Sequence, residues 1–566
     1  MDKKEFSMTR MKKLIIFVVL ICITTVLFAT GNRQTQTTEY QMQPEKSAAN
    51  SAITISVYNI DVGRTQPAAD NPVFQYLKSK LNVTFTWDIL VGDKNQREAV
   101  MIAGGQYADI LNINETKLID AGACIPLEGY IEKYAPRIKE HYKDVWDQMK
   151  SEDGHIYYLV DYGIIHGKDQ SPDYNGSAFW VQKAVLKDAG YPKIQTVDQY
   201  FTLLDNYQKK YPTINGQPTI PFVILTDDWR AFEMWNPPNF LAGYPNEGNG
   251  IVDPVTHKYT NFFTMDISKR WFQKLNELDK RNLIDRTSFT DNYDQYSAKI
   301  ASGRVLGQFA QGWQFMYDAD AANRARGQDI RTMVPLAITW DTNTRPRYRN
   351  LPIANLGRGM AISVSAKDPV RIIRFLNEYI SEEVQRTMQW GIEGQHWQYD
   401  SSKKPYRTPA QRTNWQNPTW QEQNRAKLMD MFPKIEGSFS DGYPNDLSVY
   451  APERQEMLSP EDKELLAAYN VTSYAELMDP NPPPNAIWFP TWNMPNPPDG
   501  SLAQIALDRQ EQLRRQRLPQ MILAVPAQFD GLWADYVKAS NDAGIAQYEA
   551  YMQQQLDARI KARGGK

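Results

Sequence analysis

Aromatic residues set among amides and charged groups are the part of this sequence best suited to binding a molecule. They gather in residues 226–235 (TDDWRAFEMW), 311–313 (QGW) and 390–397 (WGIEGQHW), each directly after a segment patterned as a strand or a helix. Sites are often built where the chain leaves a regular element. Indole faces suit the C–H faces of a sugar, and Asp, Asn, Arg and Glu can hydrogen-bond its hydroxyls. Core packing is the commoner role of any single tryptophan, so the prediction of a sugar site rests on the three groups together.

Residues arranged for catalysis or for metal binding are not evident. The sequence contains no HExxH, CxxC, GxSxG, GxGxxG or P-loop pattern. Asp227 and Asp228 are the most suggestive carboxylate pair, although a solvated turn or a helix cap is the commoner role of such a pair. A glycosidase-type acid and base stay open, because they are assembled in space rather than in sequence. Residues 285–294 (DRTSFTDNYD) lack the DxDxDG spacing of a calcium loop, so no catalytic residue, metal site or cofactor is predicted. The five histidines have no ligand spacing: His141, His155, His166, His257 and His396.

The composition is that of a folded protein and does not indicate a basic surface that would bind nucleic acid. The chain has 566 residues, of which 42% are hydrophobic and 23% charged, and its formal net charge is -3. A slightly acidic balance excludes a strongly basic surface for nucleic acid or for anionic lipid. Tryptophan is unusually frequent at 15 residues, which favours a role for indoles beyond core packing.

The N-terminus is patterned as an export signal. Lys12 and Lys13 precede the apolar residues 14–29, and small and polar residues follow. This pattern predicts a signal peptide over 1–31 and a periplasmic or cell-envelope location, because the apolar run is shorter than the roughly 20 residues that cross a bilayer. Cys22 follows Val19-Leu20-Ile21 rather than a small residue, so we interpret it as part of the signal and not as a lipidation site. Residues 32–50 are polar and are predicted to form a flexible linker.

Residues 53–113 carry the clearest pattern of regular structure. Alternating strands and amphipathic helices predict a β/α unit with a largely parallel sheet. Ligands of such sheets bind beyond the carboxyl ends of the strands, where the first strand delivers Asp61 and the third delivers Asn112 and Asn114. Further helices are predicted after the capping box at Thr196 and after Asp368-Pro369.

The order and spacing of several segments resemble bacterial extracellular solute-binding proteins of the maltose-binding group, in the larger branch that includes lipoprotein-like members. The likeness runs over nearly the whole mature chain that is predicted to follow the signal peptide. The segments are 107–110 (YADI), 178–186 (AFWVQKAVL) with Gly190 and 196–199 (TVDQ), 299–305 (KIASGRV), Asp368-Pro369, 390–394 (WGIEG), and the closing helices of 518–553.

The resemblance implies an α/β, two-lobed periplasmic-binding-protein fold (type II), with mixed sheets flanked by helices and a hinge between the lobes. Carried over, lobe 1 spans 51–162 plus 353–400, and lobe 2 spans 163–352 plus 401–566. The implied function is a receptor, monomeric and not an enzyme, that captures an oligosaccharide between its lobes and delivers it to the permease subunits of an ABC importer. A peptide or other amphipathic ligand stays open for the same fold, as does a secreted glycan-cleaving enzyme. The implied ligand contacts are Asp61, Asn112 and Asn114 from lobe 1, Asp228, Trp229 and Trp313 from lobe 2, and Glu393, His396 and Trp397 near the rim.

Overall fold

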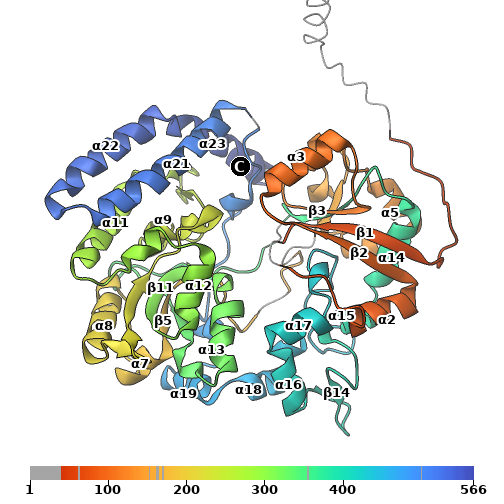
Figure 1. Ribbon diagram of the computed structural model, residues 1–566. Coiled ribbons are helices and arrows are strands. Elements are labelled where there is room, and N and C mark those ends of the chain that lie inside the picture. Colours follow the sequence, from red (N-terminus) through yellow and green to blue (C-terminus); the bar gives the residue numbers. More distant parts are fainter. Residues whose placement is uncertain are drawn as a thin grey trace, which may run out of the picture. The chain divides into compact units, whose positions relative to one another are not determined.

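The computed structural model of the chain describes residues 40–61, 64–151, 153–160, 165–168, 171–353, 356–498 and 500–565 (Figure 1). The signal peptide predicted over 1–31, including Cys22, lies outside these residues. Within the described ranges, no helix is both long and apolar enough to cross a membrane.

The first sheet is built from the β/α unit that the sequence predicts. Its strand order is β2-β1-β3-β13-β4. β1 pairs in parallel with β2 and β3, whereas β13 runs antiparallel to both β3 and β4. The predicted parallel arrangement of the first three strands is therefore confirmed. The strands are β1 (Ile53–Asn59), β2 (Val83–Ile89), β3 (Ile110–Ile113), β4 (Tyr158–Val160) and β13 (Gly359–Ile362), and the first connecting helices are α2 (Pro72–Leu81) and α3 (Lys94–Gly104).

Helix α2 shows how local sequence fixes these connections. The Asn71 side chain accepts hydrogen bonds from the backbone N–H groups of Val73 and Phe74, and Pro72 begins the helix. Both features stabilise a helix start, because Asn satisfies free N–H groups and Pro has none to satisfy. The helix ends at Asn82, whose φ of 54° is left-handed.

The second sheet has the strand order β12-β5-β11-β8. β11 lies at its centre, parallel to β8 and antiparallel to β5, and every residue of β11 is buried. The predicted capping box at Thr196 is confirmed at the start of α8. The strands are β5 (Ser177–Gln182), β8 (Ile220–Val223), β11 (Val305–Gln311) and β12 (Met333–Leu336), and among the flanking helices are α7 (Lys183–Asp188), α8 (Val197–Lys210), α11 (Asp266–Lys280) and α12 (Tyr293–Ala301).

The C-terminal helices pack on the second sheet's helices. α21 (Leu502–Leu523), α22 (Phe529–Asp542) and α23 (Ile545–Ala562) lie together beside α11 (Figure 1). The Asn276 side chain in α11 donates hydrogen bonds to backbone carbonyls at the end of α21. We call this set of elements, with the second sheet, lobe 2, and the set around the first sheet lobe 1.

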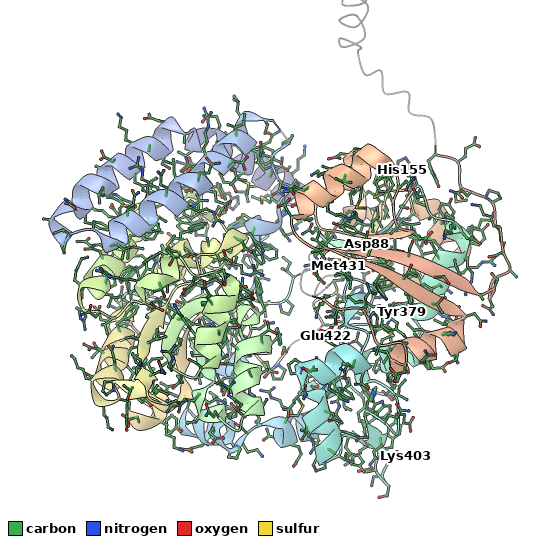
Figure 2. The ribbon with its side chains drawn as sticks, viewed as in Figure 1. Asp88, His155, Tyr379, Lys403, Glu422 and Met431 are labelled. Carbon is green, nitrogen blue, oxygen red and sulfur yellow. The ribbon has the colours of Figure 1, made fainter. Side chains whose placement is uncertain are left out.

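Residues 409–447 contact lobe 1, which differs from the boundaries predicted from sequence. Arg64 pairs with Glu422 in α17 (Pro418–Asn424) at 2.9 Å, and Phe432 packs edge-on against Phe85 of β2. Met431 is buried among the residues of the first sheet's core. Figure 2 labels Glu422 and Met431 in this segment. Beyond residue 400 the chain therefore packs against lobe 1 again, where Met431 and Phe432 cover part of the first sheet.

The described end of the predicted linker also contacts lobe 1. Ser47 donates a 2.6 Å hydrogen bond to Asp368, and Arg374 pairs with Glu45 at 2.5 Å. Asp368 caps the start of α14 (Pro369–Tyr379), and Arg374 lies in the middle of that helix. Residues 45–47 are thus attached to the lobe, within the 32–50 range that was predicted as linker.

Candidate ligand-binding site

Two exposed tryptophans meet at one edge of the second sheet. Since β8 and β11 are parallel, their carboxyl ends lie at the same edge, and each strand there continues into a short turn. The turn η2 (Asp228–Ala231) follows β8 and carries Trp229, while η4 (Gly312–Gln314) follows β11 and carries Trp313. The two indole rings stack with centroids 5.8 Å apart and an interplanar angle of 14°. Trp229 is 56% exposed and Trp313 is 39% exposed. We call this pair the indole platform.

A guanidinium and a carboxylate border the indole platform. Arg230 lies over the Trp229 ring at 4.8 Å and over the Tyr293 ring at 4.2 Å, and it forms an ion pair with Asp228. Its Nε is buried and has no hydrogen-bond partner among the described residues. The neighbouring Asp227 accepts from the Tyr293 N–H at the start of α12. Of the two adjacent carboxylates, Asp227 is therefore structural, and Asp228 is the exposed one beside the aromatic rings.

The turn that carries Trp313 is bonded to the segment just before β5. The N–H of Gly312 donates to Gly176, and the N–H of Trp313 donates to Asn175. A Cβ at position 312 would lie 2.8 Å from the Asn175 backbone, so only glycine permits this approach. Tyr317 follows in the next turn, is 59% exposed, and its hydroxyl accepts a hydrogen bond from Asn175. Sequence reasoning missed Tyr317, although its place four residues after Trp313 was an available signal.

Polar residues meet at the corresponding edge of the first sheet. The carboxyl ends of β1 and β3 share that edge, and β13 starts there because Gly359 pairs with Ile113. Arg358, directly before β13, forms an ion pair with Asp61 at 2.7 Å. Asn114 accepts a hydrogen bond from Lys94 at 2.9 Å. The structure thus places Asp61 and Asn114 at one edge, and it adds Arg358, which no local pattern marked.

Asn112 occupies the same strand end but is fully buried. Neither its side-chain oxygen nor its side-chain nitrogen has a hydrogen-bond partner within the described part of the chain. A buried amide without partners costs about 1–3 kcal/mol. Its position next to the site is therefore not explained by folding stability.

The three residues predicted at the rim take different positions. Glu393 is exposed, whereas His396 and Trp397 are each 3% exposed. The Trp397 ring packs edge-on against Trp390, and its Nε1 donates to the Gly391 carbonyl. Nδ1 of His396 accepts from the Ile392 N–H, and burial together with nearby Arg425 and Arg407 lowers the His396 pKa to about 4. The Gly391 turn, with a φ of 86°, folds both rings inward, so neither presents a face to a ligand.

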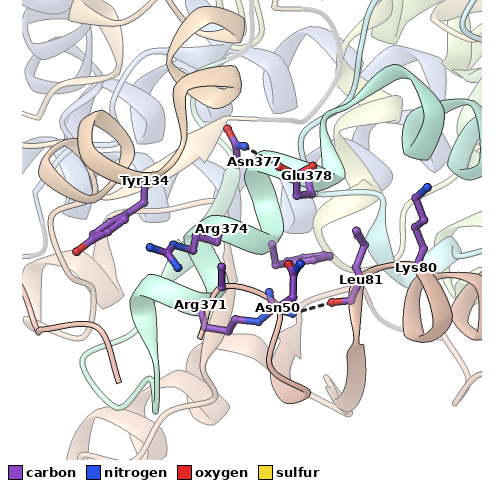
Figure 3. Close-up of a pocket in the computed structure, with 10 residues that line it drawn as sticks. Asn50, Lys80, Leu81, Tyr134, Arg371, Arg374, Asn377 and Glu378 are labelled. Carbon is purple, nitrogen blue, oxygen red and sulfur yellow. Dashed lines mark hydrogen bonds between the residues drawn. The ribbon is translucent and has the colours of Figure 1, made fainter. Parts of the chain in front are cut away.

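A separate cavity of about 400 Å³ lies on lobe 1 (Figure 3). It is lined in part by Lys80, Arg371 and Arg374, and by none of the predicted site residues. Lys80 pairs with Glu383, Arg374 pairs with Glu45, and Arg371 donates to two backbone carbonyls. These cations serve contacts within the chain, so we do not assign a ligand to this cavity.

The acidic loop at 285–294 is neutralised by a lysine. Lys299 pairs with Asp285 at 2.6 Å and also with Asp291. The ammonium thus lies where these carboxylates converge. Among the described residues, no group of three or more His, Cys, Asp or Glu side chains is arranged to hold a metal ion.

Comparison with known proteins defines first the fold and then the family. The chain is similar to three solved structures of two-lobed binding proteins, at identities low enough that the likeness concerns the fold. The alginate-binding protein AlgQ2, crystallised without calcium ion, matches with a TM-score of 0.62 and 18% identity, over 90% of this chain and all of AlgQ2. FusA, an ABC-transporter substrate-binding protein of S. pneumoniae in complex with kestose, matches with a TM-score of 0.62 and 16% identity, over 90% of this chain and all of FusA. An extracellular solute-binding protein from Bifidobacterium longum subsp. infantis matches with a TM-score of 0.63 and 16% identity, over 91% of this chain and all of that protein.

The family model for bacterial extracellular solute-binding proteins matches residues 64–386. The chain therefore belongs to the family of bacterial extracellular solute-binding proteins and has its two-lobed α/β fold, as the sequence resemblance implied. A comparison of the sequence with curated proteins finds no match.

Proposed function

We propose that the protein is an exported receptor that captures an oligosaccharide and delivers it to an ABC importer. The observation that carries this proposal is the indole platform of Trp229 and Trp313. Large aromatic faces are seldom left open to water without a partner, and here two nearly parallel faces lie at a strand edge where ligands bind. Because the two rings are nearly parallel and their centroids lie 5.8 Å apart, they suit a ligand of more than one sugar ring.

The polar groups at the two sheet edges support a neutral sugar. Asp228 is paired with Arg230, and Asp61 is paired with Arg358. Each pair offers both donors and acceptors, which is what hydroxyl groups require. Each guanidinium already has a carboxylate partner, so neither pair offers a free positive charge to an acidic sugar.

The family and the solved structures support the remaining parts of the proposal. The family comprises binding proteins of the bacterial exterior. One of the similar proteins is named as alginate-binding, and another holds kestose. We propose from these that the ligand is a carbohydrate, that the partner is the permease of an ABC importer, that the protein acts without catalysis, and that residues 1–31 direct export.

A thermal-shift panel tests the ligand class. The panel contains neutral oligosaccharides of two to five units, uronate oligosaccharides and short peptides. We expect at least one neutral oligosaccharide to raise the melting temperature, because a ligand that binds only the folded state stabilises it. Stabilisation by peptides alone would refute the carbohydrate proposal. Incubation with chromogenic glycosides is the second arm, and sustained turnover by pure protein would show an enzyme instead.

A further inference from the structure

Glu233 links the two turns that carry the indole platform. It lies in α9 (Phe232–Trp235), four residues after Trp229, and it is 1% exposed. Its Oε1 accepts a 2.8 Å hydrogen bond from the backbone N–H of Gln311, the last residue of β11. Trp313 follows two residues later. One side chain therefore joins the segment that carries Trp229 to the segment that carries Trp313.

The environment of this carboxyl group is unusual for a purely structural contact. No cation pairs with Glu233 among the described residues, and its Oε2 is buried without a hydrogen-bond partner there. Burial raises its pKa well above the usual range of a glutamate. A buried polar group with one unmade hydrogen bond costs about 1–3 kcal/mol. Only Oε1, which accepts from Gln311, therefore contributes a contact to folding, while Oε2 contributes none.

Other contacts of the two turns are of a different kind. Gly312 and Trp313 are bonded to the segment before β5. The second described link between the turns passes through Tyr293, whose hydroxyl donates to the Gln314 carbonyl at 2.7 Å while Arg230 lies over its ring. That link depends on a contact between the Arg230 guanidinium and the Tyr293 ring, whereas the Glu233 bond is buried and directed at the backbone.

We propose that Glu233 is a positioning residue that fixes the position and orientation of Trp229 relative to Trp313. Its effect on ligand affinity rests on the function proposed above, but its effect on the geometry of the two rings does not. The inference therefore predicts a signal that is measurable without any ligand.

The test compares Glu233→Gln with Glu233→Leu. Glutamine keeps a side-chain oxygen that can accept from Gln311, while leucine has similar bulk and no acceptor. Two stacked indoles couple their electronic transitions, so circular dichroism of the unliganded protein reports their relative orientation. The pair's contribution is defined as the signal that Trp313→Phe removes. We expect Glu233→Gln to keep this contribution and Glu233→Leu to lose most of it, with both variants retaining the far-ultraviolet helix signal.

Affinity for the best oligosaccharide of the panel is the second readout. We expect Glu233→Leu to weaken binding about tenfold, which corresponds to the loss of one hydrogen bond, and Glu233→Gln to bind like the wild type. If Glu233→Leu does not fold, Glu233→Asp makes the same comparison, because its shorter side chain withdraws the oxygen from Gln311.

The outcomes separate the two proposals. An unchanged indole signal in Glu233→Leu, or an equal loss in Glu233→Gln and Glu233→Leu, would overturn the positioning role. A wild type that binds no sugar, together with a lost indole signal in Glu233→Leu alone, would leave the positioning role supported and the proposed function refuted.

Discussion

Replacement of Trp229 by alanine separates a ligand-binding tryptophan from a core tryptophan. An indole buries roughly 200 Å² when fully covered. Trp229 is 56% exposed, so about 110 Å² is left for a ligand, and covering it is worth about 3 kcal/mol at 25 cal/mol per Å². Stacking on aromatic side chains, measured with nucleic-acid bases, contributes about 1–3 kcal/mol. We therefore expect Trp229→Ala to raise Kd roughly 5- to 150-fold and to lower the free energy of unfolding by only about 1 kcal/mol.

Two matched controls make this measurement specific. Trp492, in the turn η9 (Thr491–Asn493), is 48% exposed and lies outside the proposed site, so Trp492→Ala should change neither Kd nor stability by much. Trp397 is 3% exposed, and Trp397→Ala should lower the free energy of unfolding by about 3–5 kcal/mol. Titration calorimetry gives Kd, and urea denaturation gives stability. An unchanged Kd in Trp229→Ala, or equal effects in Trp229→Ala and Trp492→Ala, would refute the role of the platform.

Four further predictions concern other parts of the chain. The pKa of His396 is lowered to about 4, below the usual 6.5 that applies when the chain is unfolded, so its contribution to stability is present above pH 6.5 and is lost as pH falls towards 4. The wild type should therefore lose stability on the order of 3 kcal/mol through His396 over this pH interval, and His396→Asn should not show this loss. Urea denaturation of both proteins at pH 7.5 and 4.5 measures the loss. An equal loss of unfolding free energy in both proteins would contradict the lowered pKa. Asn112→Leu should leave the melting temperature unchanged or raise it, because it removes an unpaired buried amide, and a clear decrease would show that the amide has a structural partner. Arg358→Ala should weaken ligand binding by about 1–3 kcal/mol in calorimetry, because Asp61 loses its charged partner, and unchanged affinity would remove this edge from the site. Mass spectrometry of the exported protein should find an N-terminus near residue 31 or 32, whereas a lipid-modified Cys22 would contradict the predicted cleavage.

The elements of the fold that sequence predicts are those whose signals are local. The unit from β1 to β3 is predictable because strand alternation and helical spacing follow one another within 53–113. The start of α8 at Thr196 and that of α14 at Asp368 are predictable because a cap and its partners lie within a few residues. Residues 409–447 were predicted in lobe 2, and nothing in their local sequence shows that Phe432 packs on Phe85, far away in the chain.

The site residues that the sequence predicts are likewise those with local signals, and those that it misses depend on distant parts of the chain. Trp229 and Trp313 were predicted because each follows a strand, and the parallel pairing of β8 with β11 then brings them together. Trp397 was selected from a group that follows a helix, but its ring is buried after the turn at Gly391, and exposure cannot be read from residue type. Arg358 was missed because its partner Asp61 is 297 residues away.

The two sheet edges differ in a way that matches the two kinds of surface on a sugar. The edge of the second sheet presents the stacked faces of Trp229 and Trp313, which can cover C–H groups without requiring a particular stereochemistry. The edge of the first sheet presents the Asp61–Arg358 pair and the Asn114 amide, whose bonds are directional and distinguish one hydroxyl arrangement from another. Apolar stacking is expected to supply affinity, while a site built to hydrogen-bond a hydroxyl rejects an analogue that lacks it, because its own polar groups are then left unpaired. We therefore infer that substitutions at the indole platform weaken all ligands of the protein together, whereas substitutions at Asp61 or Arg358 change the order in which those ligands are preferred.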